Sequence, residues 1–208
     1  MKKLFFLFFS MILILIINSC ATGGGTLTIL DTSFNPESKI SLLPPRFNFE
    51  STGNIGIGSE VTVGRMIYDL LVERTPADWL SPEESVSLIQ DADVLEDYEE
   101  LLEGYQRTGI PSKAKLQSIM GAVECPYIAL CQIDHRISGV QGMSGYRFTN
   151  ITIQILSAAE GKVVLELLGE AECGSGSFDV GASKLMETAI NKAINFYPGS
   201  VPLKKNNE

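Results

Sequence analysis

The side chains of this 208-residue sequence most able to react covalently are four cysteines and a single histidine. Cys131 and His135 lie four residues apart, about 13 Å along a strand, so they cannot work together as nucleophile and base. Cys131 and Cys173 fall on inward-facing positions of two expected strands, where they could form a disulfide or be buried as free thiols. Cys125 then stays unpaired, because the three cysteines that follow Cys20 allow at most one internal disulfide. With no Cys-x-x-Cys and one histidine, no zinc site is expected.

Paired carboxylates and glycine-rich loops are the other patterns that could support chemistry. Residues 83–84 and 99–100 are adjacent glutamates on expected helices, so they point in different directions and cannot bracket a sugar bond as glycosidase acids do. Gly56 and Gly58 stand between a strand and a helix, where a dinucleotide site places its glycines, but Val61 occupies the third glycine position. We therefore expect no catalytic site, no cofactor and no enzymatic activity.

The amino terminus has the organisation of a secretory signal. Lys2 and Lys3 precede an apolar run over residues 4–17. This run is shorter than the roughly 20 residues that a membrane-spanning helix needs. Residues 1–19 are therefore expected to be a removable signal peptide.

The apolar run ends in the four residues Ile17, Asn18, Ser19 and Cys20, which resemble the lipobox of bacterial lipoproteins. The resemblance implies that cleavage occurs before Cys20 and that this cysteine carries acyl chains such as palmitate. Two or three such chains bury enough methylene groups for stable anchoring. Ala21, by resemblance to enterobacterial sorting rules, favours the outer membrane with the domain facing the periplasm.

The mature chain is expected to be strongly acidic. The whole sequence has 16 basic and 25 acidic residues and a formal net charge of -9, and loss of Lys2 and Lys3 leaves 14 against 25, or -11. Nucleic acid is not expected as a partner, because its binding depends on Lys and Arg that neutralise phosphates. The same charge argues against docking on anionic lipid through a basic patch. Membrane attachment is therefore expected through the acyl chains on Cys20.

Four segments show an apolar stripe with the helical period of 3.6 residues: residues 63–71, 94–105, 116–123 and 185–194. A further helix is expected after Ser81, because Ser81, Pro82 and Glu84 combine a serine cap, a first-turn proline and a capping-box glutamate. The helix over residues 94–105 has acidic residues on its other faces.

The remaining periodicity predicts strands. Residues 39–43 end before two prolines, and a short strand is expected near Trp79. Beyond Pro126 the period changes to two in three segments: residues 127–137, 151–155 and 163–167. These segments, with a turn at Gly161, predict an antiparallel meander. The order of elements predicts an α+β fold, an α/β two-layer sandwich whose one mixed sheet ends in this meander and is packed by amphipathic helices.

Several segments between residues 39 and 198 carry a family resemblance: residues 40–44, the helix that ends at Leu71, residues 125–130, the hairpin at residues 161–164 and the closing helix. They resemble small envelope lipoproteins with the anticodon-binding-domain-like fold. This group includes the curli secretion lipoprotein, lipoprotein activators of peptidoglycan synthases and the amino-terminal domain of the Tol-Pal translocation protein. The resemblance implies binding to another envelope protein or self-association, and it transfers no functional residues.

We expect a chain of four parts: residues 1–19, a signal peptide; 20–38, the lipidated cysteine and a tether; 39–198, a single globular domain; and 199–208, a disordered tail. The expected function is that of a non-enzymatic accessory or assembly factor that binds other proteins.

The alternatives are an oligomeric secretion-channel subunit and a cell-wall enzyme. A channel needs hairpins that cross the membrane, and residues 136–146 are too short and glycine-rich for one. The surfaces expected to be available to a partner are the acidic helix over residues 91–103 and a loop over residues 139–146.

Overall fold

The computed structural model describes residues 23–50, 60–140, 144–174 and 182–202. The strands within these ranges are β1 Gly25–Leu30, β2 Lys39–Leu42, β3 Arg46–Glu50, β4 Asp78–Leu80, β5 Tyr127–Val140, β6 Ser144–Ser157 and β7 Lys162–Gly174. The helices are α2 Glu60–Arg74, α3 Pro82–Asp91, α4 Leu95–Thr108, α5 Lys113–Val123 and α6 Ala182–Ile194. The mixture of elements confirms the predicted α+β class.

All the described strands belong to one mixed sheet with the order β1-β7-β6-β5-β2-β4, and β3 also pairs with β5. β5, β6 and β7 form the predicted antiparallel meander, and β1 continues it by pairing antiparallel with β7. β2 and β3 run parallel to β5, and β4 runs parallel to β2.

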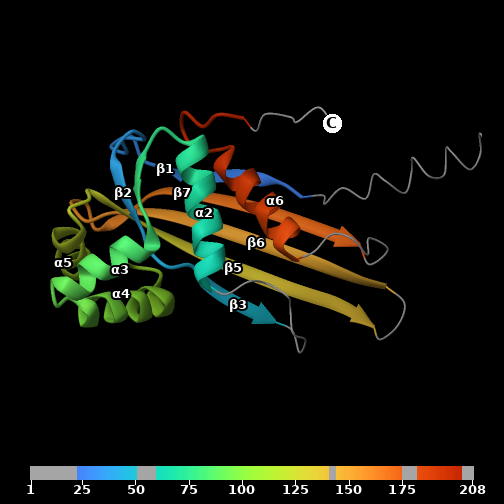
Figure 1. Ribbon diagram of the computed structural model, residues 1–208, viewed down its shortest axis with the longest axis horizontal. Helices are drawn as coiled ribbons and strands as arrows, with labels where there is room; N and C mark the ends of the chain where they lie inside the picture. The colour runs from blue at the N-terminus through green and yellow to red at the C-terminus, as the bar shows by residue number, and fades with distance from the viewer. Residues whose placement is uncertain (1–22, 51–59, 141–143, 175–181, 203–208) are drawn as a thin grey trace, which may run out of the picture.

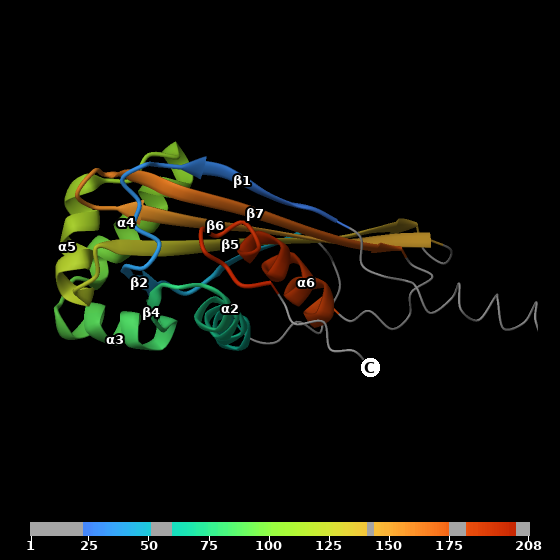
Figure 2. The same cartoon turned by 90° about the horizontal axis from the view of Figure 1, so that it is seen from above.

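Helices cover the two faces of this sheet unequally. α2 and α6 lie side by side on one face, where their apolar stripes meet side chains such as Cys131, Ile153 and Leu167. α3, α4 and α5 gather at one end of the sheet (Figures 1 and 2), where a second cluster includes Leu43 and Ile128. The opposite ends of β5 and β6 extend beyond the helices (Figure 2).

Local sequence signals explain where several elements begin and turn. The Ser81 side chain caps α3 by accepting a hydrogen bond from the backbone N–H of Glu84. The Glu84 carboxylate in turn accepts one from the backbone N–H of Ser81, which confirms the capping box. Gly161, with φ +68°, forms the turn between β6 and β7, a backbone conformation that glycine adopts without steric cost. The hairpin predicted at this position is confirmed.

The structured part of the chain extends beyond the expected domain boundaries. The range 20–38, expected to be a tether, contains β1, which pairs with β7 from Gly25 opposite Gly169. At the other end, Val201 donates its backbone N–H to the carbonyl of Arg74 at 2.8 Å, within the expected tail. The boundaries at residues 39 and 198 are therefore too narrow, because pairing partners far along the chain order both segments.

The loop expected over residues 139–146 is wrong for residues 139–140 and 144–146. Gly139 pairs with Gly145 and Val140 with Ser144, so these residues belong to two paired 14-residue strands, while residues 141–143 lie outside the described ranges.

Candidate binding surfaces

The three cysteines in the described ranges are buried free thiols, so the disulfide considered for Cys131 and Cys173 is not formed. Cys131 lies at the level of Leu167 on β7, six residues from Cys173, which corresponds to about 20 Å along the strand. A disulfide needs Cα atoms within about 7 Å. Burial raises the pKa of the Cys131 thiol to about 12, and burial also raises the pKa of Cys125. Both thiols are packing groups.

His135 is fully buried between the sheet and its helices. Its Nδ1 atom lies 2.7 Å from Oγ1 of Thr149, while its Nε2 atom has no hydrogen-bond partner. Burial, assisted by the charge of Arg147, lowers the pKa of the imidazole. Among the described residues, no group of three or more His, Cys, Asp or Glu side chains could hold a metal ion.

The acidic segment over residues 91–103 is two helices joined by a short link, because α3 ends at Asp91 and α4 begins at Leu95. Its carboxylates are partly engaged with α5. Asp97 accepts hydrogen bonds from Lys115 at 2.9 Å and from Ser118 at 2.5 Å. These hydrogen bonds, Ser118 first, lower the pKa of Asp97. The segment therefore holds two helices together as well as presenting charge.

The edge strand β1 exposes several aliphatic side chains within one short segment. Leu27, Ile29 and Leu30 are 37%, 39% and 50% exposed, although they follow one another along a single short strand. β1 pairs with β7 on one side and ends the strand order on the other. Its sequence has no charge and no proline to discourage further pairing. Within the described ranges, no strand pairs with this outer edge of β1.

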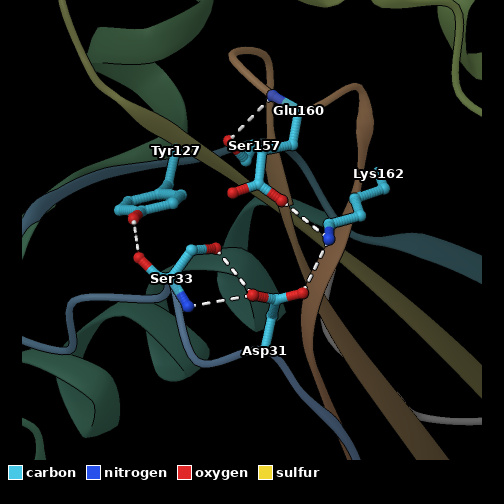
Figure 3. Close-up of polar contacts among 6 residues, drawn as sticks. All are labelled: Asp31, Ser33, Tyr127, Ser157, Glu160 and Lys162. Atoms are coloured by element: carbon cyan, nitrogen blue, oxygen red, sulfur yellow. Dashed lines mark hydrogen bonds and ion pairs between the residues drawn. The ribbon is translucent and has the colours of Figure 1, made fainter.

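A polar cluster fixes the carboxyl end of β1 to the β6–β7 turn (Figure 3). Asp31 accepts hydrogen bonds from the Ser33 backbone at 2.9 Å, the Ser33 hydroxyl at 2.8 Å and Lys162 at 2.7 Å. Lys162 also pairs with Glu160 at 2.7 Å, and Tyr127 donates to the Ser33 carbonyl at 3.3 Å. The bond from Lys162 is the largest cause that lowers the pKa of Asp31. The cluster holds the exposed edge strand in place.

Hydrogen bonds connect β1 with helix α4 across the sheet face that α2 and α6 leave open. Thr28 donates to Glu166 Oε1 at 2.8 Å, and the amide of Gln154 donates to the other oxygen of Glu166. The Tyr105 hydroxyl in turn donates to Gln154 Oε1 at 3.0 Å. Burial, together with the charge of Glu166, raises the pKa of Tyr105 and keeps its hydroxyl protonated.

A groove of about 450 Å³ lies at the α4 end of this network. Its polar lining includes Arg46, Tyr105, Gln106, Gln132 and Gln154. Arg46 donates to Gln106 Oε1 at 3.0 Å and to the Leu102 carbonyl at 3.4 Å, which links β3 to α4. Side-chain amides and a phenol are groups that can hydrogen-bond to a peptide backbone.

Neither surface is predicted from the sequence. β1 lies within the expected tether, although the alternation of Thr26, Leu27, Thr28 and Ile29 is a strand signal. Tyr105 is expected only as part of an apolar helical stripe. Cys20, the lipidation site expected from the lipobox, lies outside the described residues.

In the described ranges, no helix is both long enough and apolar enough to cross a membrane. No protein-family model matches the sequence, and no curated protein matches it. Solved structures with a similar fold include the LpoB C-terminal domain from Salmonella enterica, 12% identical over 67% of this chain and 86% of that chain, with a TM-score of 0.41. A PelC dodecamer from Paraburkholderia phytofirmans is 13% identical over 86% of this chain and 99% of that chain, with a TM-score of 0.43.

A third such structure is lipoprotein GNA1162 from Neisseria meningitidis, which is 12% identical over 76% of this chain and 96% of that chain, with a TM-score of 0.41. Of these three structures, the one from Neisseria meningitidis is described as a lipoprotein.

Proposed function

We propose that this chain is a lipid-anchored, non-enzymatic envelope protein that binds another envelope protein and acts as an accessory or assembly factor. The observation that carries the proposal is the exposed apolar edge formed by Leu27, Ile29 and Leu30 of β1. β1 begins at Gly25, five residues after Cys20, where the acyl chains would be attached. The edge is thereby held near the lipid surface, on the periplasmic side of the outer membrane.

Strand addition is the binding mode that this edge supports. Soluble proteins usually protect an edge strand with charged residues, prolines or covering segments, because unpaired N–H and C=O groups invite another strand. The sequence of β1 is Gly-Thr-Leu-Thr-Ile-Leu, which retains the hydrogen-bonding groups and adds exposed aliphatic side chains. A partner strand would gain main-chain hydrogen bonds from this edge and apolar contacts from its side chains.

The groove beside α4 supplies a second, polar contact. It is joined to β1 through the hydrogen bonds of Glu166, Gln154 and Tyr105, so the two surfaces belong to one face of the domain. A partner bound at both would combine apolar strand pairing with hydrogen bonds to side-chain amides. Such a combination of apolar core and polar surround is typical of protein interfaces.

The test is photo-crosslinking in intact cells with a photoreactive amino acid at position Ile29 of the full chain. We expect capture of one defined envelope protein, weakened by Cys20→Ala because the anchor no longer concentrates the chain at the membrane. Leu27→Asp should also weaken the capture, since it places a charge on the edge without disturbing a buried residue. Val72, which is 48% exposed on α2, provides a control position of similar exposure.

Absence of a product at Ile29, or the same products at Ile29 and Val72, would contradict the proposal. A ladder of self-crosslinks that closes at a fixed number of copies would instead favour the oligomeric secretion-channel subunit. The β1 edge also permits that outcome, because identical chains can add strands to one another through such an edge.

A further inference from the structure

We propose that the hairpin end, defined as residues 136–140 of β5 and 144–148 of β6, contacts the membrane and lies in the lipid headgroup layer. This inference rests on the proposed anchoring at Cys20. It adds to that function a second membrane contact, made by the fold itself, and with it an orientation of the domain on the membrane.

The direction of β1 determines where the chain that precedes it leaves the sheet. β1 runs antiparallel to β7, so the chain before Gly25 leaves the sheet toward the hairpin end. The backbone N–H of Glu170 in β7 donates a hydrogen bond to the carbonyl of Gly24. Through Asn150 of β6, Glu170 lies at the level of Asp134 on β5. The hairpin end and the chain that leads back to Cys20 therefore leave the sheet on the same side.

The two segments differ in how far they can extend beyond the level of Asp134 and Glu170. From Asp134 to Val140 the strand continues for six residues, about 20 Å at 3.3 Å per residue. From Gly24 back to Cys20 there are four residues, which span at most about 14 Å when fully extended. The hairpin end therefore reaches farther than the chain to Cys20. If the strands stand upright on the membrane with Cys20 at its surface, the hairpin end enters the headgroup layer. This layer is about 5 to 8 Å thick on each side of a bilayer.

The sequence of the hairpin end fits this location. No acidic residue occurs between Asp134 and Glu160, in a chain with 25 of them. Arg136 lies opposite Phe148, and Arg147 lies opposite Ile137, so the two arginines project from opposite faces of the hairpin. Arginine beside apolar and aromatic residues is favourable at a membrane interface, where the long side chain reaches the polar layer.

Charge elsewhere in the domain favours the same orientation. The acidic residues closest in register to the hairpin end are Glu50, opposite Arg136, and Glu172, opposite Phe148. By contrast, α4 has five acidic residues and one basic residue, and it lies at the opposite end of the sheet (Figure 2). Its Tyr105 contacts Gln154, which pairs with Leu130, about 33 Å along β5 from Val140. Anionic headgroups repel the α4 end and leave the hairpin end as the part that can approach.

The experiment uses depth-dependent fluorescence quenching by brominated lipids. Acylated full-length protein with Tyr146→Trp is reconstituted into phosphatidylcholine and phosphatidylglycerol vesicles with bromine on the upper acyl chain. Tyr146 pairs with Ser138 in the hairpin end, and the wild type, whose single tryptophan is the buried Trp79, gives the baseline. Ala159→Trp is the control, because Ala159 is exposed in the β6–β7 turn at the other end of the same strands.

We expect the bromine to remove most of the fluorescence that Tyr146→Trp adds and little of the fluorescence that Ala159→Trp adds. Ser138→Trp should behave like Tyr146→Trp, which secures the result if one substitution disturbs the strand. The inference is overturned if both variants, Tyr146→Trp and Ser138→Trp, bind vesicles but are quenched no more than Ala159→Trp. That result would leave the proposed anchoring intact. Failure of the wild type to float with vesicles overturns the proposed function, and this inference with it.

Discussion

Arg74, the last residue of α2, lies buried against Asn191 of α6, with its Nη1 atom 2.6 Å from Asn191 Oδ1. The same guanidinium donates to the Asn191 carbonyl at 3.2 Å and to the Val201 carbonyl at 3.1 Å, and it also contacts Asn195. One side chain thus joins α2, α6 and the segment that follows α6. Burial lowers the pKa of this arginine, but the group stays charged at neutral pH.

Replacing Arg74 by methionine should lower the free energy of unfolding by about 2 to 3 kcal/mol, because several buried acceptors lose their donor. Arg74→Lys should recover only part of this loss, since an ammonium cannot reproduce the planar fork. Urea denaturation measures both. Arg65→Met on the same helix is the control, because Arg65 is 68% exposed and should change stability by no more than about 0.5 kcal/mol. Equal effects at the two arginines would refute the buried role of Arg74.

Stability should fall as the pH is lowered from about 7.5 to about 5.5, because of His135. The folded state lowers the pKa of this imidazole, so the unfolded chain binds the proton more readily. The stabilisation is therefore present above the unfolded pKa and is lost as the pH falls through the folded value. Since this is the single histidine of the chain, His135→Gln should flatten the dependence of the urea midpoint on pH in this range. If the urea midpoint of His135→Gln depends on pH as steeply as that of the wild type, groups other than His135 cause the dependence.

Gly169 marks the place where α6 packs directly on the sheet. A Cβ atom there would collide with the Ala189 carbonyl and lie 2.7 Å from the Ala193 backbone nitrogen. Gly169→Ala should therefore destabilise the domain by about 1 to 3 kcal/mol, because helix and strand must separate. Gly104→Ala, in α4 with nothing near the added methyl group, should instead stabilise it by about 0.5 to 1 kcal/mol. Thermal unfolding of both variants tests the opposite signs.

The ion pair between Asp31 and Lys162 should control local opening of β1. Asp31→Asn is expected to speed amide hydrogen exchange in residues 26–30 relative to β6, because the end of the edge strand loses its strongest contact. The difference between wild type and variant should shrink in high salt, which screens the pair. Because the folded pKa of Asp31 lies below its unfolded value, the contribution is present above the unfolded pKa and is lost as the pH falls below it. Unchanged exchange in β1 would show that pairing with β7 alone holds the strand.

Several elements of this protein follow from local sequence. The serine, proline and glutamate at residues 81, 82 and 84 specify the start of α3 through bonds made within one turn. The change to alternating apolar residues after Pro126, with Gly161 at the turn, determines the β5–β6–β7 meander because neighbouring strands need only a short link to pair. In such places the interaction that shapes the backbone lies within a few residues, so the sequence shows it directly.

Other features exist only through contacts between distant parts of the chain. The alternation of threonine and aliphatic residues in β1 permits an extended segment, but β1 is held as a strand because β7, about 140 residues later, offers an edge to Leu27 and its neighbours. Gly139 and Gly145 favour a loop on local grounds, yet they lie opposite each other in paired strands because the long register of β5 and β6 holds them. Cys131 and Cys173 share an inward orientation that alternation predicts, but their separation along the sheet depends on strand register, which only the assembled sheet fixes.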